Sequence, residues 1–275
     1  MPHRPIAPDA GRARLGYVRA VLAVAGVLLV AGCSAETPAA PADGTLEVDV
    51  LATIPHDPQA FTQGLELVDG VLYEGTGLEG ESSIRTVDPE TGAVEKKVDL
   101  PADLFGEGIT VAGDTIWQIT WQDGVAIRRD RATLAEEARV PYDGEGWGLC
   151  HDGDRLVMSD GTDRLTFRDV RTFAARGEVR VRDTDDQPLT NLNELECVDG
   201  QVYANVWQTD RIVRIDPGTG QVTAEVDLSG LLPEEDRAGT DVLNGIAAVP
   251  GTDEFLVTGK LWPSMFRVRF VTPGT

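Results

Sequence analysis

Histidine and cysteine are scarce in this chain of 275 residues, which has three of each. Three cysteines exclude a scaffold held together mainly by disulfides. Three histidines leave little material for a histidine-rich zinc centre or a Ser-His-Asp triad. Basic residues are also few. The 24 Lys and Arg residues stand against 46 Asp and Glu, a net charge of −22, which disfavours nucleic acid or an anionic membrane surface as a partner.

The amino terminus lacks a hydrophobic run long enough to cross a bilayer. Residues 20–31 form an apolar run of 12 residues, which suits the core of a signal peptide. Four arginines precede it, and it ends in a Val-Ala-Gly-Cys string at Cys33 that resembles the bacterial lipobox. We therefore predict a lipoprotein signal peptide at residues 1–32 and a flexible Ala/Pro-rich tether at residues 33–44. The alternative is an ordinary secretory signal in which Cys33 is incidental.

The predicted mature protein is more acidic than the full chain. Removal of residues 1–32 takes away four Arg and one Asp, which leaves 20 basic and 45 acidic side chains and a net charge of −25. We expect an exported, monomeric cell-envelope lipoprotein that meets the membrane only through a lipid on Cys33.

The rest of the chain has the composition of a turn-rich β protein. Its 41% hydrophobic and 25% charged residues exclude disorder as the main state, and 30 Gly and 16 Pro favour strands joined by turns. Five segments repeat one pattern, a short β-run, a turn and a second β-run. Their first strands open at Gly64, Gly108, Gly148, Glu194 and Gly245, with spacings of 44, 40, 46 and 51 residues. A period in the forties is typical of four-stranded β-propeller blades.

The last repeat is one strand short. Only the runs at 255–258 and 265–270 follow its first strand, whereas an unassigned alternating run lies at residues 46–54. Pairing that amino-terminal strand with the last blade would close the ring and remove exposed edges. We predict an all-β fold, a five-bladed β-propeller over residues 45–272. A six-bladed ring is the alternative, but about 230 residues are too few for it at this period.

The repeat also predicts a site on one face of the propeller. The loop that opens each first strand and the loop that leaves each second strand share a face around the central channel. The residues before the repeat position are Gln63, Glu107, Trp147, Asn193 and Asn244, and the matching positions after the second strands are Gly77, Trp121, Gly161, Trp207 and Lys260. Aromatic walls with a few polar groups suit a small-ligand pocket. We expect Trp117 and Trp262 to pack between blades instead, and Asn244 fits a turn residue or a ligand contact equally well.

Two cysteines of the predicted propeller lie in neighbouring first strands. A disulfide between Cys150 and Cys197 fits an oxidising compartment. Their repeat offsets differ by one, which tends to direct them to opposite faces. The sequence leaves this bond open.

Motifs from all five repeats resemble one enzyme family, the plant and bacterial type of glutaminyl-peptide cyclotransferase, over residues 46–270. The strings that carry the resemblance are Phe61-Thr62-Gln63-Gly64-Leu65-Glu66, Phe105-Gly106-Glu107-Gly108, Gln118-Ile119-Thr120-Trp121, Gly144-Glu145-Gly146-Trp147-Gly148-Leu149, Asn193-Glu194-Leu195-Glu196, Ala204-Asn205-Val206-Trp207, Asn244-Gly245-Ile246 and Thr258-Gly259-Lys260-Leu261-Trp262-Pro263. The resemblance implies a five-bladed propeller that converts amino-terminal Gln to pyroglutamate with release of ammonia and without a catalytic zinc ion. The presumed acid/base of the family matches Glu107, and its pocket residues match Phe61, Gln63, Trp121, Trp147, Asn193, Trp207 and Lys260.

These residue types suit the cyclisation of peptides that begin with Gln. Glu107 would move a proton from the attacking α-amine to the departing ammonia. Lys260, Asn193 and Gln63 would stabilise the oxyanion, and the three indoles would orient the substrate. No metal or other cofactor is required for this chemistry.

Two other classes of protein remain as alternatives. A propeller lipoprotein could bind peptide or sugar on its aromatic rim without turnover, although a pure binder would not require a carboxylate at Glu107. A propeller lactonase or metal-dependent hydrolase is disfavoured because the predicted rim has no cluster of Asp, Glu and His.

Overall fold

The computed structural model describes residues 44–273, and these residues form strands and one short 3-10 helix, η1 (Glu234–Asp236). The predicted signal peptide, Cys33 and residues 33–43 of the predicted tether lie outside this part of the chain. Within residues 44–273, no helix has the length and apolar character needed to span a membrane.

Three antiparallel sheets of four strands follow one another along the chain. The first contains β2 (Thr62–Val68), β3 (Val71–Thr76), β4 (Ser83–Val87) and β5 (Val94–Asp99). The second contains β6 (Gly106–Ala112), β7 (Thr115–Thr120), β8 (Val125–Asp130) and β9 (Glu136–Pro141). The third contains β10 (Leu149–Asp152), β11 (Arg155–Ser159), β12 (Arg164–Asp169) and β13 (Ala175–Arg180).

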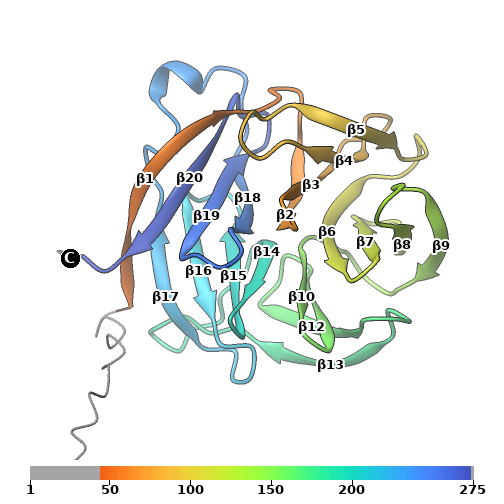
Figure 1. Ribbon diagram of the computed structural model, residues 1–275. Helices are drawn as coiled ribbons and strands as arrows, with labels where there is room; N and C mark the ends of the chain where they lie inside the picture. The colour runs from red at the N-terminus through yellow and green to blue at the C-terminus, as the bar shows by residue number, and fades with distance from the viewer. Residues whose placement is uncertain (1–43, 274–275) are drawn as a thin grey trace, which may run out of the picture. The chain divides into compact units, whose positions relative to one another are not determined.

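The remaining strands form one sheet of eight, in the order β14-β15-β16-β17-β1-β20-β19-β18. They are β14 (Leu192–Val198), β15 (Gln201–Val206), β16 (Arg211–Ile215), β17 (Val222–Asp227), β18 (Leu243–Ala248), β19 (Glu254–Gly259), β20 (Ser264–Val271) and β1 (Thr45–Pro55). Strand β1 pairs antiparallel with β20 from Glu47 to Pro55, but parallel with β17 only at Thr45 and Leu46. The amino-terminal strand therefore lies beside β20 as a fourth strand to β18, β19 and β20 (Figure 1).

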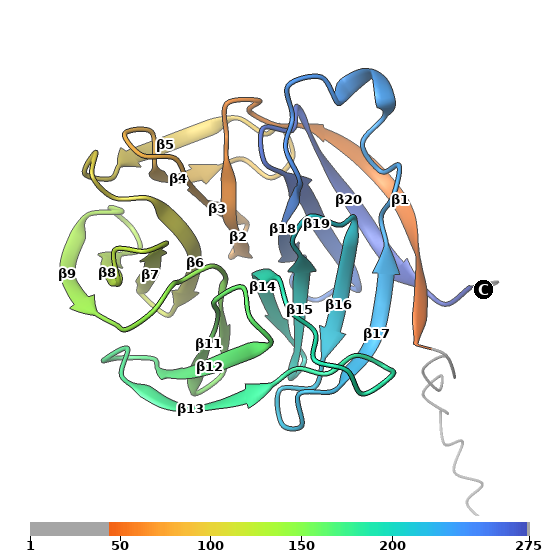
Figure 2. The ribbon, with the colours of Figure 1, turned by 180° about the vertical axis from the view of Figure 1, so that it is seen from behind.

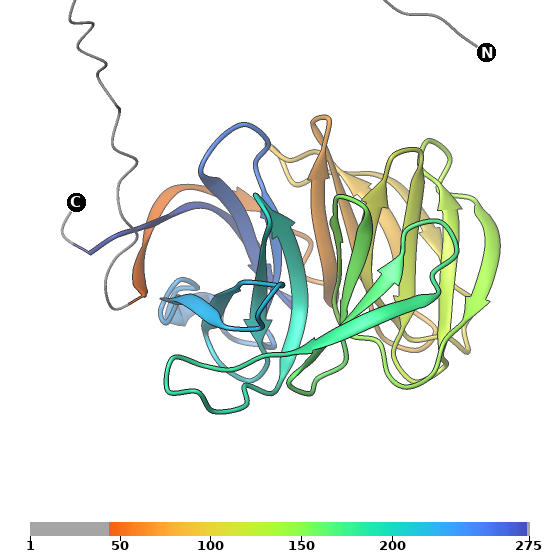
Figure 3. The same ribbon diagram turned by 90° about the horizontal axis from the view of Figure 1, so that it is seen from below.

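The sheets are arranged around a common centre, seen from its two ends in Figures 1 and 2. The innermost strands β2, β6, β10, β14 and β18 contact one another in turn, and β18 contacts β2. The repeated glycines permit this approach. A Cβ on Gly64 would lie 2.5 Å from the backbone nitrogen of Ile109, and one on Gly108 would lie 2.7 Å from that of Leu149. Figure 3 shows the same sheets from the side, with the turns gathered at the two faces.

Burial falls from the innermost to the outermost strand of each sheet. Strand β6 is buried at six of its seven residues, whereas β5 is exposed at five of its six. Apolar side chains fill the space between neighbouring sheets, where Val157 and Leu165 of the third sheet pack with Leu195 and Val213 of the next. Because the inner strands are covered on both faces, they do not alternate between apolar and polar residues as a half-exposed strand does.

A disulfide joins two of these innermost strands. Cys150 of β10 and Cys197 of β14 are bonded, with their Cα atoms 5.4 Å apart. The sequence left this bond open, because an offset of one tends to direct the two side chains to opposite faces. In a ring of sheets, the front of one sheet packs against the back of the next, so cysteines on opposite faces of neighbouring units point toward each other.

Candidate active site

The polar residues predicted from the repeat lie on β-bulges. The pairing of β2, β6, β14 and β18 with their partners shifts by one residue near the start of each strand. The residues within these shifts include Gln63, Glu107, Asn193 and Asn244. Trp147 stands at the corresponding position before β10. A bulge takes a residue out of the ladder and redirects its side chain, here toward one end of the ring.

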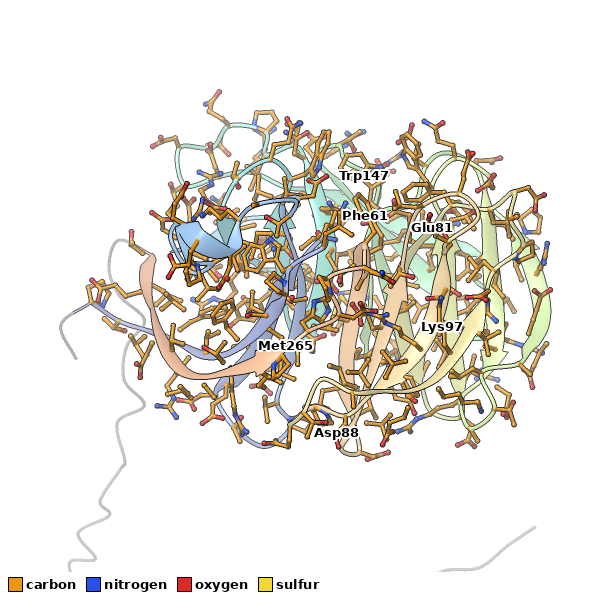
Figure 4. The ribbon with its side chains drawn as sticks, turned by 90° about the horizontal axis from the view of Figure 1, so that it is seen from above. Phe61, Glu81, Asp88, Lys97, Trp147 and Met265 are labelled. Atoms are coloured by element: carbon orange, nitrogen blue, oxygen red, sulfur yellow. A yellow bond between two sulfur atoms is a disulfide. The ribbon has the colours of Figure 1, made fainter. Side chains whose placement is uncertain are left out.

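Backbone hydrogen bonds connect the loops that open the first strands to the loops that leave the second strands. Four bonds repeat this connection: Gly77 N–H to Phe61 O (2.8 Å), Trp121 N–H to Phe105 O (3.0 Å), Trp207 N–H to Asn191 O (2.8 Å) and Lys260 N–H to Val242 O (2.9 Å). Figure 4 shows Phe61 and Trp147 at one end of the molecule and Asp88 at the other. The two sets of loop positions therefore share a face, as the repeat predicted.

A cavity of about 370 Å³ opens on this face, and we call it the aromatic cavity. Its lining includes all eight residues that the sequence singled out for the pocket: Phe61, Gln63, Glu107, Trp121, Trp147, Asn193, Trp207 and Lys260. The lining also contains Phe105, Gln208, Asp241 and Val242, which sequence reasoning missed. The catalytic and binding roles of these residues remain predictions.

Aromatic rings form two walls of the cavity. On one side, Phe105 meets Phe61 edge-on at 6.3 Å between centroids and Trp121 at 5.6 Å. On the other, Trp147 and Trp207 meet at 5.4 Å with their planes at 88°. Glycines make room for these rings. A Cβ on Gly77 would lie 2.6 Å from the Phe105 ring, and one on Gly161 would lie 2.6 Å from the Trp147 ring.

Glu107 is a buried carboxyl with little compensation for its burial. Its side chain is 5% exposed. Its Oε1 accepts a 2.9 Å hydrogen bond from Gln63 Nε2, whereas Oε2 has no hydrogen-bond partner in the described part of the chain. Burial raises the pKa of Glu107 well above its usual value, and the positive charge of Lys260 only partly opposes this. The group therefore holds a proton more readily than an exposed carboxyl does, which suits proton transfer.

Lys260 is also buried, and it brings a basic group to the cavity where Glu107 brings an acidic one. Burial lowers the pKa of its ammonium group, and the charges of Glu107 and Asp241 oppose that effect. Its Nζ lies 4.8 Å from the centroid of the Phe61 ring, within the range of a cation–π contact. A desolvated ammonium in this position is suited to stabilise a developing negative charge.

Asn244 supports the cavity instead of lining it. It is fully buried, and its Nδ2 donates to Thr62 O at 3.0 Å and to Gln63 Oε1 at 3.3 Å. Because Gln63 Oε1 accepts the bond from Asn244, the amide nitrogen of Gln63 faces Glu107. Trp117 and Trp262 are buried in packing, against Phe173 and Phe266 respectively, as expected. Among residues 44–273, no group of three or more His, Cys, Asp or Glu side chains is arranged to hold a metal ion.

Comparisons with known proteins agree with this geometry. A family model described as glutamine cyclotransferase matches residues 22–270. The chain belongs to that family. A glutaminyl-peptide cyclotransferase of Arabidopsis thaliana is 40% identical over 229 residues, covering 81% of this chain and 71% of the relative. The crystal structure of Myxococcus xanthus glutaminyl cyclase matches with a TM-score of 0.77 and 35% identity, over 82% of this chain and 97% of the other.

Membership in the glutamine cyclotransferase family confirms the resemblance found in the sequence. Two of the missed lining residues had a repeat signature. Phe105 and Val242 stand two residues before Glu107 and Asn244, as Phe61 stands two before Gln63. Asp241 and Gln208 have no such relation, and only the folded chain brings them to the cavity.

Proposed function

We infer that this chain carries out the reaction of its family in the aromatic cavity. The reaction converts an amino-terminal glutaminyl residue of a peptide to pyroglutamate and releases ammonia. The observation that carries the assignment to this cavity is Glu107, a buried carboxyl with one unpaired oxygen between two aromatic walls. The match to a glutaminyl-peptide cyclotransferase over most of the chain supports the reaction itself.

In the mechanism we propose, Glu107 moves one proton. The α-amine has an ordinary pKa of about 7.7–8.0, so a usable neutral fraction exists near pH 7. Its nitrogen attacks the side-chain amide carbon, which forms the lactam C–N bond. The ionised form of Glu107 takes a proton from the attacking nitrogen and then gives it to the amide nitrogen. The bond between the amide carbon and this protonated nitrogen then breaks, and ammonia leaves.

The negative charge on the amide oxygen needs donors during this sequence. Asn193 of β14 and Lys260, which follows β19, both line the cavity and supply an amide and an ammonium. Gln63 has one amide hydrogen left after its bond to Glu107, and it serves as a third donor.

The aromatic walls orient the substrate. Trp121, Trp147 and Trp207 hold the glutaminyl side chain folded toward its own amine, which is the orientation that cyclisation requires. Phe61 completes the wall beneath Lys260.

Ammonia release from a Gln-initiated dipeptide tests the reaction. We expect the purified protein to release ammonia, and Glu107→Gln to lower kcat by about 10² to 10⁴ because the amide cannot transfer a proton. Trp207→Ala should mainly raise KM, since it removes apolar contact with the substrate. A parent protein that binds the peptide without releasing ammonia would replace this function with that of a binding module.

The finer architecture we propose is a five-bladed β-propeller over residues 45–272. Its support is the contact of β2, β6, β10, β14 and β18 in turn, and the addition of β1 to β20. In this arrangement β1 is the fourth strand of the last blade and closes the ring, with no exposed edge left on β20.

We also propose that the protein is exported and anchored to the cell envelope through a lipid on Cys33. The support is the small residues before Cys33 and the short apolar run that precedes them. The parent should partition into detergent from isolated membranes, and Cys33→Ala should be released or left unprocessed. Equal membrane association of the two forms would refute the anchor.

A further inference from the structure

A carboxylate stands where other repeats carry an apolar wall residue. Glu145 lies two residues before Trp147, the repeat position that Phe61, Phe105 and Val242 occupy in other units. Those three side chains line the aromatic cavity. The corresponding position of the third unit therefore brings a charge to the edge of the same cavity.

The Glu145 carboxylate joins two walls of the cavity. Its Oε2 accepts hydrogen bonds from Trp121 Nε1 at 2.9 Å and from Trp147 Nε1 at 3.0 Å. Its Oε1 accepts a third bond, from Gln122 Nε2 at 2.9 Å. The bond from Trp147 and those from Gln122 and Trp121 hold the pKa of Glu145 below its ordinary value, despite partial burial. The acceptor therefore stays ionised at neutral pH.

The two indoles come from different sheets. Trp121 follows β7 and is 37% exposed, so its ring stands at the mouth of the cavity, whereas Trp147 precedes β10. A single oxygen atom shared by both N–H groups restricts the orientation of both rings relative to each other.

The backbone around Glu145 is held without its side chain. Gly146 N–H donates to Trp121 O at 2.9 Å, and Trp147 N–H donates to Ser159 O at 3.1 Å. The loop keeps these bonds when the carboxylate is removed, so the consequence of the removal falls on the indoles.

We propose that Glu145 is a positioning residue that clamps Trp121 and Trp147 and so presets the mouth of the cavity for an amino-terminal glutaminyl residue. This inference rests on the roles proposed above for the cavity. Two rings already held in place lose less rotational freedom when a substrate binds. The clamp therefore acts mainly on substrate binding, and it reaches the chemical step only secondarily, through the Glu145 charge that helps to raise the pKa of Glu107.

Two substitutions at this position separate a clamp from an acid/base group. Glu145→Leu keeps most of the volume but removes every acceptor, and we expect KM to rise about tenfold with kcat within about threefold of the parent. Glu145→Gln keeps a neutral acceptor, so it should restore KM to within about threefold. Glu137→Leu, on the exposed outer strand β9, is the control for loss of one surface charge.

A spectroscopic measurement tests the clamp without turnover. The chain has five tryptophans, so a ¹H–¹⁵N spectrum contains five indole N–H resonances, assigned by single Trp→Phe variants. In Glu145→Leu, the resonances of Trp121 and Trp147 should move, and that of Trp207 can follow because its ring contacts Trp147, while those of Trp117 and Trp262 stay in place. Unmoved Trp121 and Trp147 resonances would overturn the clamp whether or not the parent is active.

The kinetic outcomes are equally decisive. If both Glu145 variants lose kcat by a hundredfold or more with KM unchanged, Glu145 transfers a proton and the clamp is wrong. If Glu145→Leu changes neither constant, the clamp does not act on the substrate. An inactive parent instead refutes the reaction proposed above, and the indole resonances then decide the clamp alone.

Discussion

Two buried carboxyls on neighbouring sheets behave in opposite ways. Glu74 of β3 is fully buried, and it accepts hydrogen bonds from His56 Nε2 (3.0 Å), Thr62 Oγ1 (2.7 Å) and Arg85 Nε (2.9 Å). Burial would raise its pKa, but the charges of His56 and Arg85 outweigh burial and lower it to about 2. Glu107 is almost as buried, has one hydrogen bond and keeps a raised pKa.

The comparison separates a structural carboxyl from the one to which we assign proton transfer. The two sites have similar burial, so the number and charge of the partners decide the protonation state. Glu74 also connects distant segments, because His56 Nδ1 donates to Trp262 O at 2.7 Å, 206 residues away. Glu107 keeps an unpaired oxygen that a substrate can use. Full pairing favours stability, and incomplete pairing favours proton transfer.

The largest change in Tm should come from removing the charge of Glu74. Glu74→Gln leaves His56 buried without its counter-charge and leaves Arg85 with Asp57 as its remaining partner, and loss of one partner of a buried ion pair typically costs about 3–5 kcal/mol. We expect the Tm to fall by about 10 °C, measured by calorimetry or circular dichroism near pH 6. Glu95→Gln, on the exposed strand β5, is the matched control. A Tm within 2 °C of the parent would contradict the role of Glu74.

The pH dependence of stability should follow from the ionisation of Glu74 and His56. The contribution of Glu74 is present above its ordinary pKa of 4.5 and is lost as pH falls toward about 2, which corresponds to about 3 kcal/mol. Burial lowers the pKa of His56, but Glu74 and the bond to Trp262 O outweigh it and raise the pKa above 6.5. The contribution of His56 is therefore complete below pH 6.5 and is lost as pH rises through the folded-state pKa.

A half-buried carboxyl, Glu66, adds to the loss on the alkaline side. Burial raises the pKa of Glu66 to about 7, so its ionisation costs folding energy as pH rises from 4.5. We expect the parent Tm to be highest near pH 4.5 and to fall on both sides, with the His56 loss added above pH 6.5. Glu74→Gln should flatten the acid side of this curve, and an unchanged acid slope in that variant would assign the loss to other groups.

The smallest change in Tm should come from substituting Glu107, and it should be a rise instead of a fall. Because the folded-state pKa of Glu107 is raised, the group opposes folding at any pH above its unfolded value. Glu107→Gln should therefore unfold at a slightly higher temperature than the parent at pH 7, with each kcal/mol worth about 2–4 °C. The difference should vanish near pH 4. A lower Tm at pH 7 would show that Glu107 stabilises the fold.

The repeat pattern predicted the residues that line the cavity better than it predicted the ion pairs and the disulfide that stabilise the surrounding structure. Gln63, Glu107, Trp147 and Asn193 share one repeat offset, and equal offsets in equivalent units lie on the same face. Phe105 was within reach of the same argument. Such positions can be read from the sequence because the repeat itself carries the geometry.

The pairing of Glu74 could not be predicted in that way. His56 lies in a connecting segment, so no repeat offset links it to Glu74. Arg85 lies opposite Glu74 across the β3–β4 hairpin, a contact that depends on the register of that hairpin and not on the repeat. The disulfide was left open for a related reason. The offset of Cys150 and Cys197 is informative only after one knows which faces of neighbouring sheets meet.

The bulges at the start of the inner strands have a consequence for redesign. Each frees one or two residues from the ladder while the rest of the strand keeps its pairing. A substitution at Gln63 or Asn193 can therefore alter what the cavity binds without shifting the register of a hairpin. Several such positions surround one cavity and some contact one another, as Gln63 contacts Glu107. Libraries that vary them together would sample new amino-terminal substrates on an unchanged frame.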